Sequence, residues 1–170
     1  MTYQALSSQI AFAAGDHAAA EEHARRAIEL DPEFWIGYMQ FGQVLERLGE
    51  TERAIEALET AARFSSGNSK PISLRGYILA KTGRRKEAQE VMKVLETASR
   101  ERYVPPYAFA LICAGLGETD LALEWLEHVV EAHDVHAVFL TNDPKWDFLR
   151  HNRRFAQVLN RCAFATRRTG

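Results

Sequence analysis

The strongest constraint on the fold of this chain is an internal repeat with a period of 34 residues. Four glycines recur at this interval, and four alanines keep the same interval in a second phase: Gly15, Gly49, Gly83, Gly117, Ala20, Ala54, Ala88 and Ala122. A period in this range is typical of a stack of supersecondary units, each too small to bury its own apolar face. Because neighbouring units bury those faces together, most apolar positions in such a chain serve the scaffold.

Each block of the repeat contains two stretches with the apolar periodicity of a helix, and the recurring glycine separates them. The glycine falls where the first helix must stop and reverse, a position that favours the left-handed backbone that glycine adopts without a Cβ clash. The sequence therefore predicts four helical hairpins. Small residues are expected to face one another within each hairpin and to let its helices approach closely, in the pairs Ser8 and Ala20, Gly42 and Ala54, Gly76 and Ala88, and Ala110 and Ala122.

This pattern resembles the tetratricopeptide repeat family, in which aromatic, Leu, Gly and Ala positions recur in a fixed order. The second block matches best, through Tyr38, Phe41, Gly42, Leu45, Gly49, Ala54, Leu58 and Ala61. The first block closes with the family's phrase from Ala27 to Pro32, and Pro32 is expected to start the next helix. The resemblance implies an all-α, right-handed α-solenoid of helical hairpins with a C-terminal capping helix. Repeats are expected at residues 1–34, 35–68, 69–102 and 103–134, and a helical cap with a basic tail at residues 135–170.

The blocks differ from one another, and the differences predict irregularities in the stack. In the first block Tyr3, Leu6, Ser7 and Ile10 fit the pattern only after a shift of one residue, which predicts an irregular or truncated edge helix. Later blocks carry larger residues at the second small position and lack the closing proline, so their joins are expected to differ in angle. The residues concerned are Leu95, Val129, Ser66, Arg100 and Asp134.

In a stack of this kind the first helix of every hairpin lines the concave surface. The resemblance places amide, basic and aromatic side chains there, a composition that suits an extended peptide or a partner helix. We therefore predict a non-catalytic protein–protein interaction module whose groove comprises Gln9, Gln40, Gln43, Arg47, Lys70, Tyr77, Lys81 and Tyr107. Met39, Leu74 and Leu111 belong to the same helices, and for these three the alternative is packing between repeats.

One subset of the family grips the C-terminal carboxylate of chaperones with Lys, Asn and Arg side chains from three successive repeats. The corresponding positions here hold Ala5, Gln9, Gln40, Lys70 and Leu74, and only Lys70 matches. The sequence therefore argues against a chaperone tail as the partner.

The passage from Tyr103 to Leu159 has a narrower resemblance, to the C-terminal repeat region of bacterial signalling proteins such as winged-helix regulators, adenylate cyclases and Ser/Thr kinases. It departs from them at His151, Asn152 and Arg153, where such sequences usually show Ser, Asp and Pro. The alternative function is therefore a sensory or regulatory C-terminal domain, and a chain that starts in phase at Met1 is what excision from a longer protein would give. The matching residues are Pro106, Tyr107, Gly115, Leu116, Gly117, Glu118, Ala122, Trp125, Leu126, Asp143, Pro144, Trp146, Leu149, Arg150 and Phe155.

Composition narrows the classes of protein to which the chain can belong. Hydrophobic residues make up 46% and charged residues 26%, which is typical of a soluble globular protein and argues against disorder. Cys113 and Cys162 are too few and too far apart for a disulfide framework, so a reducing compartment is expected. The sequence contains neither an apolar run of membrane-spanning length nor a signal peptide. Together these features predict a cytoplasmic protein with no membrane partner.

Charge is distributed unevenly along the chain. Six arginines and no acidic residue fall between Arg150 and Gly170. The whole chain carries −2, so removing these six positive charges leaves −8 on residues 1–149. A solvated face on a terminal helix is the simpler interpretation; contact with nucleic acid is a weaker alternative, because no aromatic residues are interleaved with the arginines as stacking platforms.

One cluster contains residue types that bind metals, namely His128, His133 and His136 with Glu131 and Asp134. His133 and His136 are three residues apart and could share a helix face, as a zinc pair requires. No cysteine pair or strong carboxylate motif accompanies them, so an exposed polar face is the simpler interpretation. Because the sequence also lacks a nucleophile–base motif and a phosphate-binding loop, we expect neither enzymatic activity nor a cofactor. The partner's identity and the oligomeric state stay open.

Overall fold

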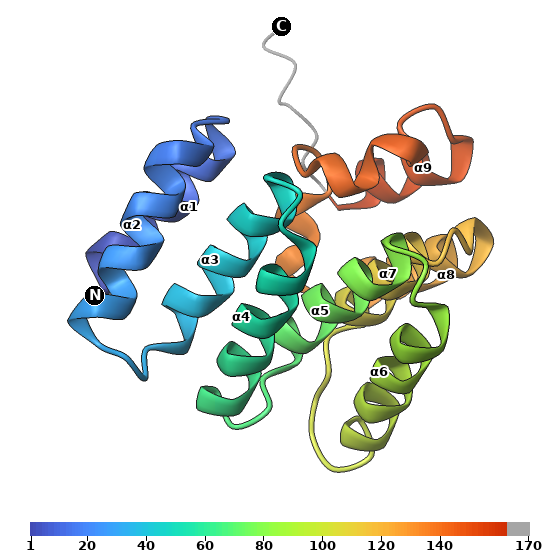
Figure 1. Ribbon diagram of the computed structural model, residues 1–170. Coiled ribbons are helices and arrows are strands. Elements are labelled where there is room, and N and C mark those ends of the chain that lie inside the picture. Colours follow the sequence, from blue (N-terminus) through green and yellow to red (C-terminus); the bar gives the residue numbers. More distant parts are fainter. Residues whose placement is uncertain (163–170) are drawn as a thin grey trace, which may run out of the picture.

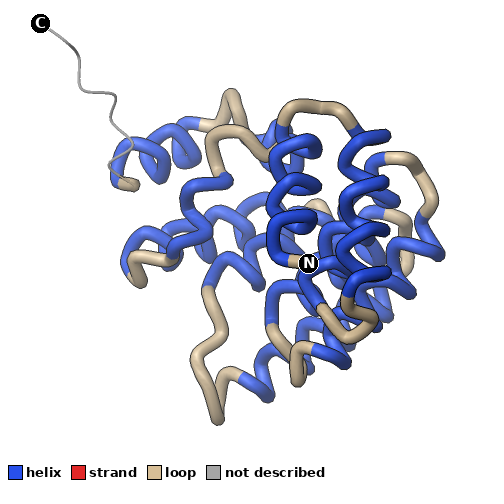
Figure 2. Tube along the Cα trace, turned by 90° about the vertical axis from the view of Figure 1, so that its left-hand side faces the viewer, coloured by secondary structure: helices blue, strands red, loops and turns tan. Residues whose placement is uncertain are grey.

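The computed structural model describes residues 1–162, and all regular elements in this part of the chain are helices (Figures 1 and 2). The first eight form four successive hairpins, which confirms the predicted all-α solenoid; its right-handed sense stays a prediction. Two 3-10 helices and a last α-helix follow. The elements are α1 (Thr2–Ala13), α2 (His17–Leu30), α3 (Trp35–Arg47), α4 (Thr51–Phe64), α5 (Ser69–Lys81), α6 (Arg85–Ala98), α7 (Pro106–Gly115), α8 (Thr119–Glu131), η1 (Val135–Phe139), η2 (Pro144–Leu149) and α9 (Arg153–Arg161).

Each hairpin turns at one of the recurring glycines. Gly15, Gly49, Gly83 and Gly117 have φ angles of 81°, 81°, 83° and 73°, in the left-handed region that side chains with a Cβ disfavour. The amide that follows each glycine donates to the carbonyl five residues before it, with N···O distances of 2.8–3.0 Å. This bond satisfies a carbonyl at the end of the helix and closes the turn. The predicted role of the four glycines is therefore confirmed.

Small residues bring the two helices of a hairpin close together, as predicted, in the first two hairpins. Ser8 and Ala20 are both buried, and the Ser8 hydroxyl donates to the Ala20 carbonyl at 2.7 Å. A Cβ added to Gly42 would lie 2.7 Å from Cγ of Leu58 and 3.2 Å from the carbonyl oxygen of Ala54. Neither site has room for a larger side chain without a shift of its neighbours.

The third hairpin uses its small residue differently, because α7 packs directly along α5 (Figure 1). A Cβ on Gly76 would meet Cδ1 of Ile112 in α7 at 2.7 Å and Cγ1 of Val91 in α6 at 3.0 Å, so this glycine makes room both for its hairpin partner and for the next hairpin. At the other end of the contact, a Cβ on Gly115 would lie 2.8 Å from the carbonyl oxygen of Tyr77 and 2.9 Å from Cβ of Ala80. The join between the third and fourth hairpins therefore differs from the earlier joins.

Two predictions about the first hairpins are wrong. Pro32 does not start a helix, because α2 ends at Leu30 and α3 begins at Trp35. Asp31 lies in the turn between them, where its carboxylate accepts a hydrogen bond from the Glu33 amide at 3.0 Å. This bond stabilises the turn that contains Pro32. The edge helix α1 is continuous from Thr2 to Ala13 and is not irregular.

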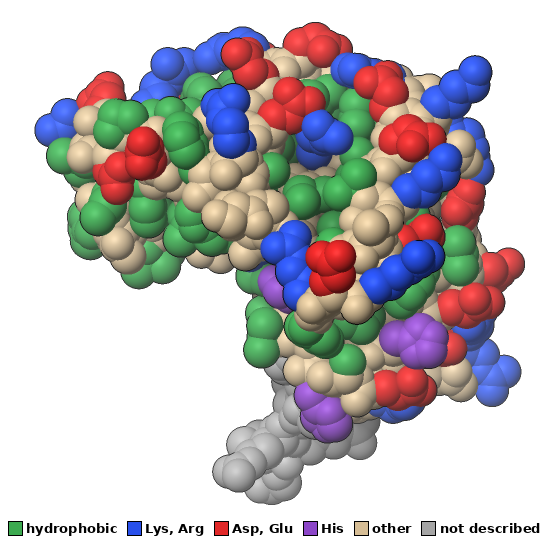
Figure 3. All heavy atoms as spheres, turned by 90° about the horizontal axis from the view of Figure 1, so that it is seen from below, with side chains coloured by type: hydrophobic (Ala, Val, Ile, Leu, Met, Phe, Trp, Pro, Cys, Tyr) green, Lys and Arg blue, Asp and Glu red, His purple; other side chains and the backbone are tan. Residues whose placement is uncertain are grey.

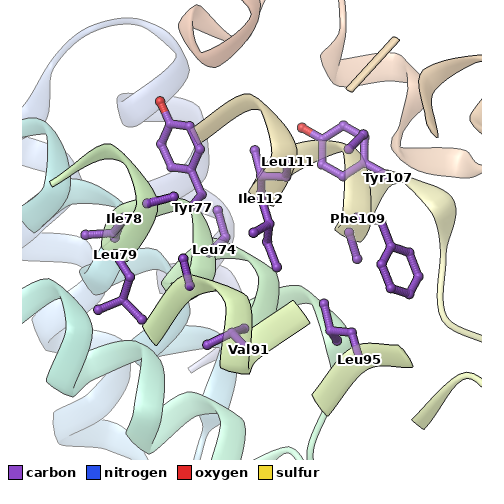
Figure 4. Close-up of a cluster of buried hydrophobic side chains, with 14 of the residues drawn as sticks. Leu74, Tyr77, Ile78, Leu79, Val91, Leu95, Tyr107, Phe109, Leu111 and Ile112 are labelled. Carbon is purple, nitrogen blue, oxygen red and sulfur yellow. The ribbon is translucent and has the colours of Figure 1, made fainter. Parts of the chain in front are cut away.

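Buried apolar side chains form a continuous core from α3 to α9. Figure 4 shows its centre, where Val91 and Leu95 of α6 lie below side chains of α5 and α7. Tyr77 and Tyr107 point their hydroxyl groups to the opposite side, which is the side of η1 and η2 (Figure 4). The core thus connects the hairpins with the C-terminal elements.

The described part of the C-terminal segment contains two 3-10 helices and an α-helix. The apolar stretch beginning at His136 forms η1, and Asp143 accepts the amide of Lys145 at 3.0 Å and so caps η2. Phe155 and Val158 form the buried face of α9. The boundary of this cap at residue 135 stays a prediction, and residues 163–170 of the predicted basic tail lie outside the described residues.

Candidate functional site: a cleft on the concave side

A cleft of about 450 Å³ lies between the first helices of the four hairpins and the segment that contains η1 and η2. From below, the outline of the molecule is indented beside the N-terminal hairpin (Figure 3). The cleft walls are mostly apolar and aromatic, with a few amide and basic groups between them, a composition typical of ligand sites. The lining residues are Gln9, Phe12, Ala13, Gly15, His17, Gln40, Gln43, Arg47, Lys70, Ser73, Leu74, Tyr107, Leu111, Val138, Phe139, Asn142, Asp143 and Pro144.

Six of the eight predicted groove residues line this cleft: Gln9, Gln40, Gln43, Arg47, Lys70 and Tyr107. They come from α1, α3, α5 and α7, because the 34-residue period places the same face of every first helix on the same side of the stack. Leu74 and Leu111, for which packing was the alternative, are buried and also contribute to the lining.

Amide groups from α3 form the polar floor of the cleft. The Gln43 side chain donates from Nε2 to Oε1 of Gln40 at 3.2 Å, and Gln40 itself is buried. A buried amide that is anchored in this way has a fixed orientation. Because the Gln43 side chain donates only one hydrogen bond within the described structure, its second N–H group and its carbonyl oxygen can bond a ligand in the cleft.

Lys70 stands at the start of α5 and is half-buried. Its Nζ lies 5.1 Å from the ring centre of Phe139, and no carboxylate within residues 1–162 forms an ion pair with it. Burial lowers the pKa of the Lys70 amino group, and the nearby charge of Lys145 lowers it further. The cleft therefore contains a cation that an acidic group would stabilise.

The remaining charges in the lining are only partly neutralised. Arg47 is exposed at the end of α3, and no ion pair to it occurs in the described part of the chain. Asp143 is the one acidic residue in the lining, and its carboxylate lies 3.3 Å from the Lys145 amino group. The cleft as a whole therefore favours an anionic group over a cationic one.

Tyr107 forms a wall of the cleft and is not an exposed anchor. Its side chain is buried, its ring stacks on His136 with centroids 5.3 Å apart, and its hydroxyl accepts from Nε1 of Trp146 at 3.3 Å. Burial raises the pKa of the Tyr107 hydroxyl, and the carboxylate of Asp143 raises it further. The phenol therefore stays neutral at physiological pH.

Tyr77 and Lys81, the other two predicted groove residues, do not line the cleft. Tyr77 is buried, and burial, followed by the charge of Glu46, raises its pKa to about 12. Lys145 of the C-terminal segment lies 5.9 Å from its ring centre. Lys81 forms an ion pair with Glu46 at 2.7 Å. Lys145 of the C-terminal segment therefore lies over the Tyr77 ring, and Lys81 is exposed outside the cleft.

Sequence reasoning missed the second wall of the cleft, which η1 and the turn after it provide. Phe139 and Asn142 belong to this wall. Their only sequence signal was an apolar stretch followed by a turn, which does not reveal that the segment returns to the concave side. His17 was missed as well, and its Nδ1 is buried without a hydrogen-bond partner in the described structure.

The histidine cluster separates into independent contacts. Nδ1 of His128 lies 3.1 Å from the Glu131 carboxylate on the exposed face of α8, and Nδ1 of His136 lies 2.7 Å from the Asp134 carboxylate. His133 occupies the turn after α8, with a φ angle of 51°. Within residues 1–162 no group of three or more His, Cys, Asp or Glu side chains is arranged to hold a metal ion.

Asp134 replaces the repeat's closing proline and has a structural role. Its buried carboxylate accepts the amide of Tyr107 at 3.1 Å and the amide of His136 at 3.0 Å. Burial opposes ionisation, but hydrogen bonds from His136 and Tyr107 and the nearby imidazole outweigh it and hold the pKa of Asp134 below its usual value. Asp134 thereby ties the start of α7 to the C-terminal segment.

Comparison with known proteins supports the resemblance inferred from the repeat. The sequence matches the model of the tetratricopeptide repeat over residues 2–34 and 37–68, which contain α1 with α2 and α3 with α4. A search of curated proteins found no match. No helix within residues 1–162 is long and apolar enough to cross a membrane.

Proposed function

We propose that the chain is a protein-interaction module whose concave cleft binds a segment of a partner protein. Tetratricopeptide repeats generally mediate protein–protein interactions, and two of the hairpins match this repeat. The observation that carries the proposal is the cleft itself, where four first helices and the C-terminal segment converge on apolar, amide and basic groups. A volume of about 450 Å³ suits a few side chains of a peptide.

The chemistry of the walls favours a partner segment with an acidic group next to an apolar side chain. Lys70 and Arg47 offer positive charge without an acidic partner in the described structure. Phe12, Leu74 and Phe139 offer apolar surface, and Gln43 can bond a peptide backbone. None of these groups needs a cofactor, and no catalytic step is proposed.

The test begins with affinity capture and mass spectrometry to identify the partner, followed by calorimetric titration of its binding segment. Lys70→Glu should weaken binding by about tenfold or more, because it removes the cation and introduces a repelling charge. Lys86→Glu is the matched control, since Lys86 is an exposed lysine of α6 outside the cleft. Unchanged affinity in Lys70→Glu would overturn the proposed site, and equal weakening by both variants would indicate a general charge effect.

A second candidate is the sensory or regulatory domain of a bacterial signalling protein. It is favoured by the packing of residues that carry that resemblance, since Tyr107, Trp146, Leu149 and Phe155 are all buried and Trp146 bonds Tyr107. Sequencing the gene upstream of Met1 tests it. A coding extension for an effector domain would support this function, and its absence would contradict it. A cytoplasmic location stays a prediction.

Nucleic-acid contact through the arginine-rich end is the weaker alternative. Arg154 pairs with Glu127 at 3.1 Å, and Arg150 pairs with Asp147 at 3.1 Å. These pairings reduce the positive field that a phosphate backbone requires.

A further inference from the structure

The cleft carries positive charge at two separate places, on two neighbouring first helices. Lys70 is the second residue of α5, and Arg47 is the last residue of α3. Both line the cleft, and neither forms an ion pair within residues 1–162. A cavity with two cations that lack acidic partners attracts negative charge at both places.

The register of the two helices sets the distance between these cations. Nζ of Lys81 at the end of α5 lies 2.7 Å from Oε1 of Glu46, which directly precedes Arg47 at the end of α3. The C-terminal ends of the two helices therefore lie side by side, and Lys70 is eleven residues back along α5. At a rise of about 1.5 Å per residue, the two cations are attached about 16 Å apart along the groove.

The Lys70 end of the cleft has an excess of positive charge. The side chain of Lys145 is 8% exposed and lies near Lys70: burial lowers the pKa of the Lys70 amino group, and the charge of Lys145 lowers it further. Asp143 pairs with Lys145 at 3.3 Å, so the two ammonium groups and the one carboxylate carry a net charge of +1. A carboxylate from a partner would neutralise this charge.

The surface between the two cations suits an extended chain. Gln43 lies one helical turn before Arg47, and its amide bonds only Gln40 within residues 1–162. The backbone groups of an extended segment need such partners, whereas those of a helix are already bonded to one another. A helix about 10 Å wide would also fill roughly 1,200 Å³ over this distance, against a cleft of about 450 Å³.

We propose that the partner segment is extended and carries two acidic residues about five positions apart, with an apolar residue between them. The spacing is the separation of about 16 Å divided by the rise of an extended chain, about 3.3 Å per residue. One carboxylate pairs with Lys70 and the other with Arg47, while the apolar residue packs on Leu74 and Phe139 of the cleft walls. This inference rests on the proposed function, because it specifies the partner of the same cleft.

Selection from a display library of random peptides, with the whole chain immobilised, tests this spacing. The peptides are long enough to span the cleft either as an extended strand or as a helix. Enriched peptides should carry a pair of acidic residues about five positions apart. Pairs about eleven positions apart would indicate a bound helix and would overturn the inference. Enrichment of peptides with a single acidic residue would overturn it too.

Calorimetric titration of one enriched peptide assigns the two contacts. Lys70→Gln should weaken its binding about tenfold, and Arg47→Gln about threefold, because the Arg47 side chain is exposed. In each variant, changing one acid of the peptide to glutamine should cost no further affinity, whereas changing the other acid should still weaken binding. Lys86→Gln is the matched control and should bind like the wild type, since Lys86 is an exposed lysine of α6 outside the cleft.

The inference and the proposed function fail in different ways. A peptide that needs only one acid, and loses affinity in Lys70→Gln but not in Arg47→Gln, overturns the two-acid motif and leaves the cleft as the binding site. A peptide with unchanged affinity for Lys70→Gln, Arg47→Gln and Gln43→Ala binds outside the cleft, which contradicts both. Absence of any enriched peptide also counts against both. Circular dichroism should show unchanged helicity in every variant.

Discussion

Replacing Gly115 by alanine probes the close contact between α5 and α7. The added Cβ would lie 2.8 Å from the carbonyl oxygen of Tyr77, 2.9 Å from Cβ of Ala80 and 3.1 Å from Cδ2 of Tyr77. Contacts below 3.0 Å force a shift, and a backbone carbonyl inside a helix cannot rotate away as a side chain can. The two helices must therefore separate or tilt.

The magnitude follows from two opposing effects. Overpacking of a tight contact costs about 1–3 kcal/mol, while alanine in a helix gains about 0.5–1 kcal/mol over glycine. Since Gly115 is the last residue of α7, the gain falls at the low end. We expect a net loss of about 1–2 kcal/mol in the free energy of unfolding, equivalent to roughly 2–8 °C in Tm for a chain of this size.

Urea unfolding followed by far-UV circular dichroism measures the change directly. Gly37→Ala is the matched control, because its one tight contact would be with the side-chain Cγ1 of half-buried Ile28 at 3.1 Å; Cβ of Ala27 at 3.4 Å and the backbone nitrogen of Ile28 at 3.5 Å are ordinary van der Waals contacts. Its stability should stay within about 0.5 kcal/mol of the wild type, since the helix preference for alanine offsets the tighter contact. If Gly115→Ala proves as stable as the wild type, the close packing of α7 on α5 is refuted.

Three further predictions concern the hairpins, the C-terminal tie and the thiols. Ala54→Leu should cost about 1–3 kcal/mol in urea unfolding by overpacking the second hairpin, and no loss would contradict the close contact with Gly42. Because the pKa of Asp134 is depressed in the folded state, its stabilisation is complete above the unfolded-state pKa and is lost as pH falls through the folded value. The Tm advantage of the wild type over Asp134→Asn should therefore shrink on acidification below about pH 4, and a gap independent of pH would refute this role. Burial raises the pKa of the Cys113 thiol to about 12, so thiol reagents should modify Cys162 first and Cys113 only after unfolding; rapid native modification of Cys113 would contradict its burial.

The helical hairpins could be predicted because their determinants are local. A turn that needs the left-handed region needs a glycine such as Gly49 or Gly83 whatever its neighbours are. The repeat also predicted that Gln43 and Lys70 belong to the groove, because positions 34 residues apart lie on the same face of successive first helices. Both residues line the cleft. Local rules were sufficient wherever the contact partner belonged to the same repeat.

The sequence predictions were incomplete where a residue contacts an element outside its own repeat. Gly76 makes room for Ile112 of the next hairpin as well as for Val91 of its own, because α7 packs along α5, and the local pattern predicts only the contact within the hairpin. Phe139 reaches the cleft only because the chain folds back after Asp134, where the repeat phase ends. Tyr77 does not line the cleft that the repeat pattern alone assigned to it, and Lys145 of the C-terminal segment lies over its ring.

A photo-crosslinking amino acid placed at Gln43 tests the central claim that the cleft receives a partner chain. Gln43 lines the cleft from α3, and an equivalent probe at exposed Val94 of α6 serves as the reference. With the captured partner present, the Gln43 probe should form a covalent adduct that maps to one acidic segment of the partner, and the Val94 probe should not. Adducts at Val94 without adducts at Gln43 would contradict binding in the cleft.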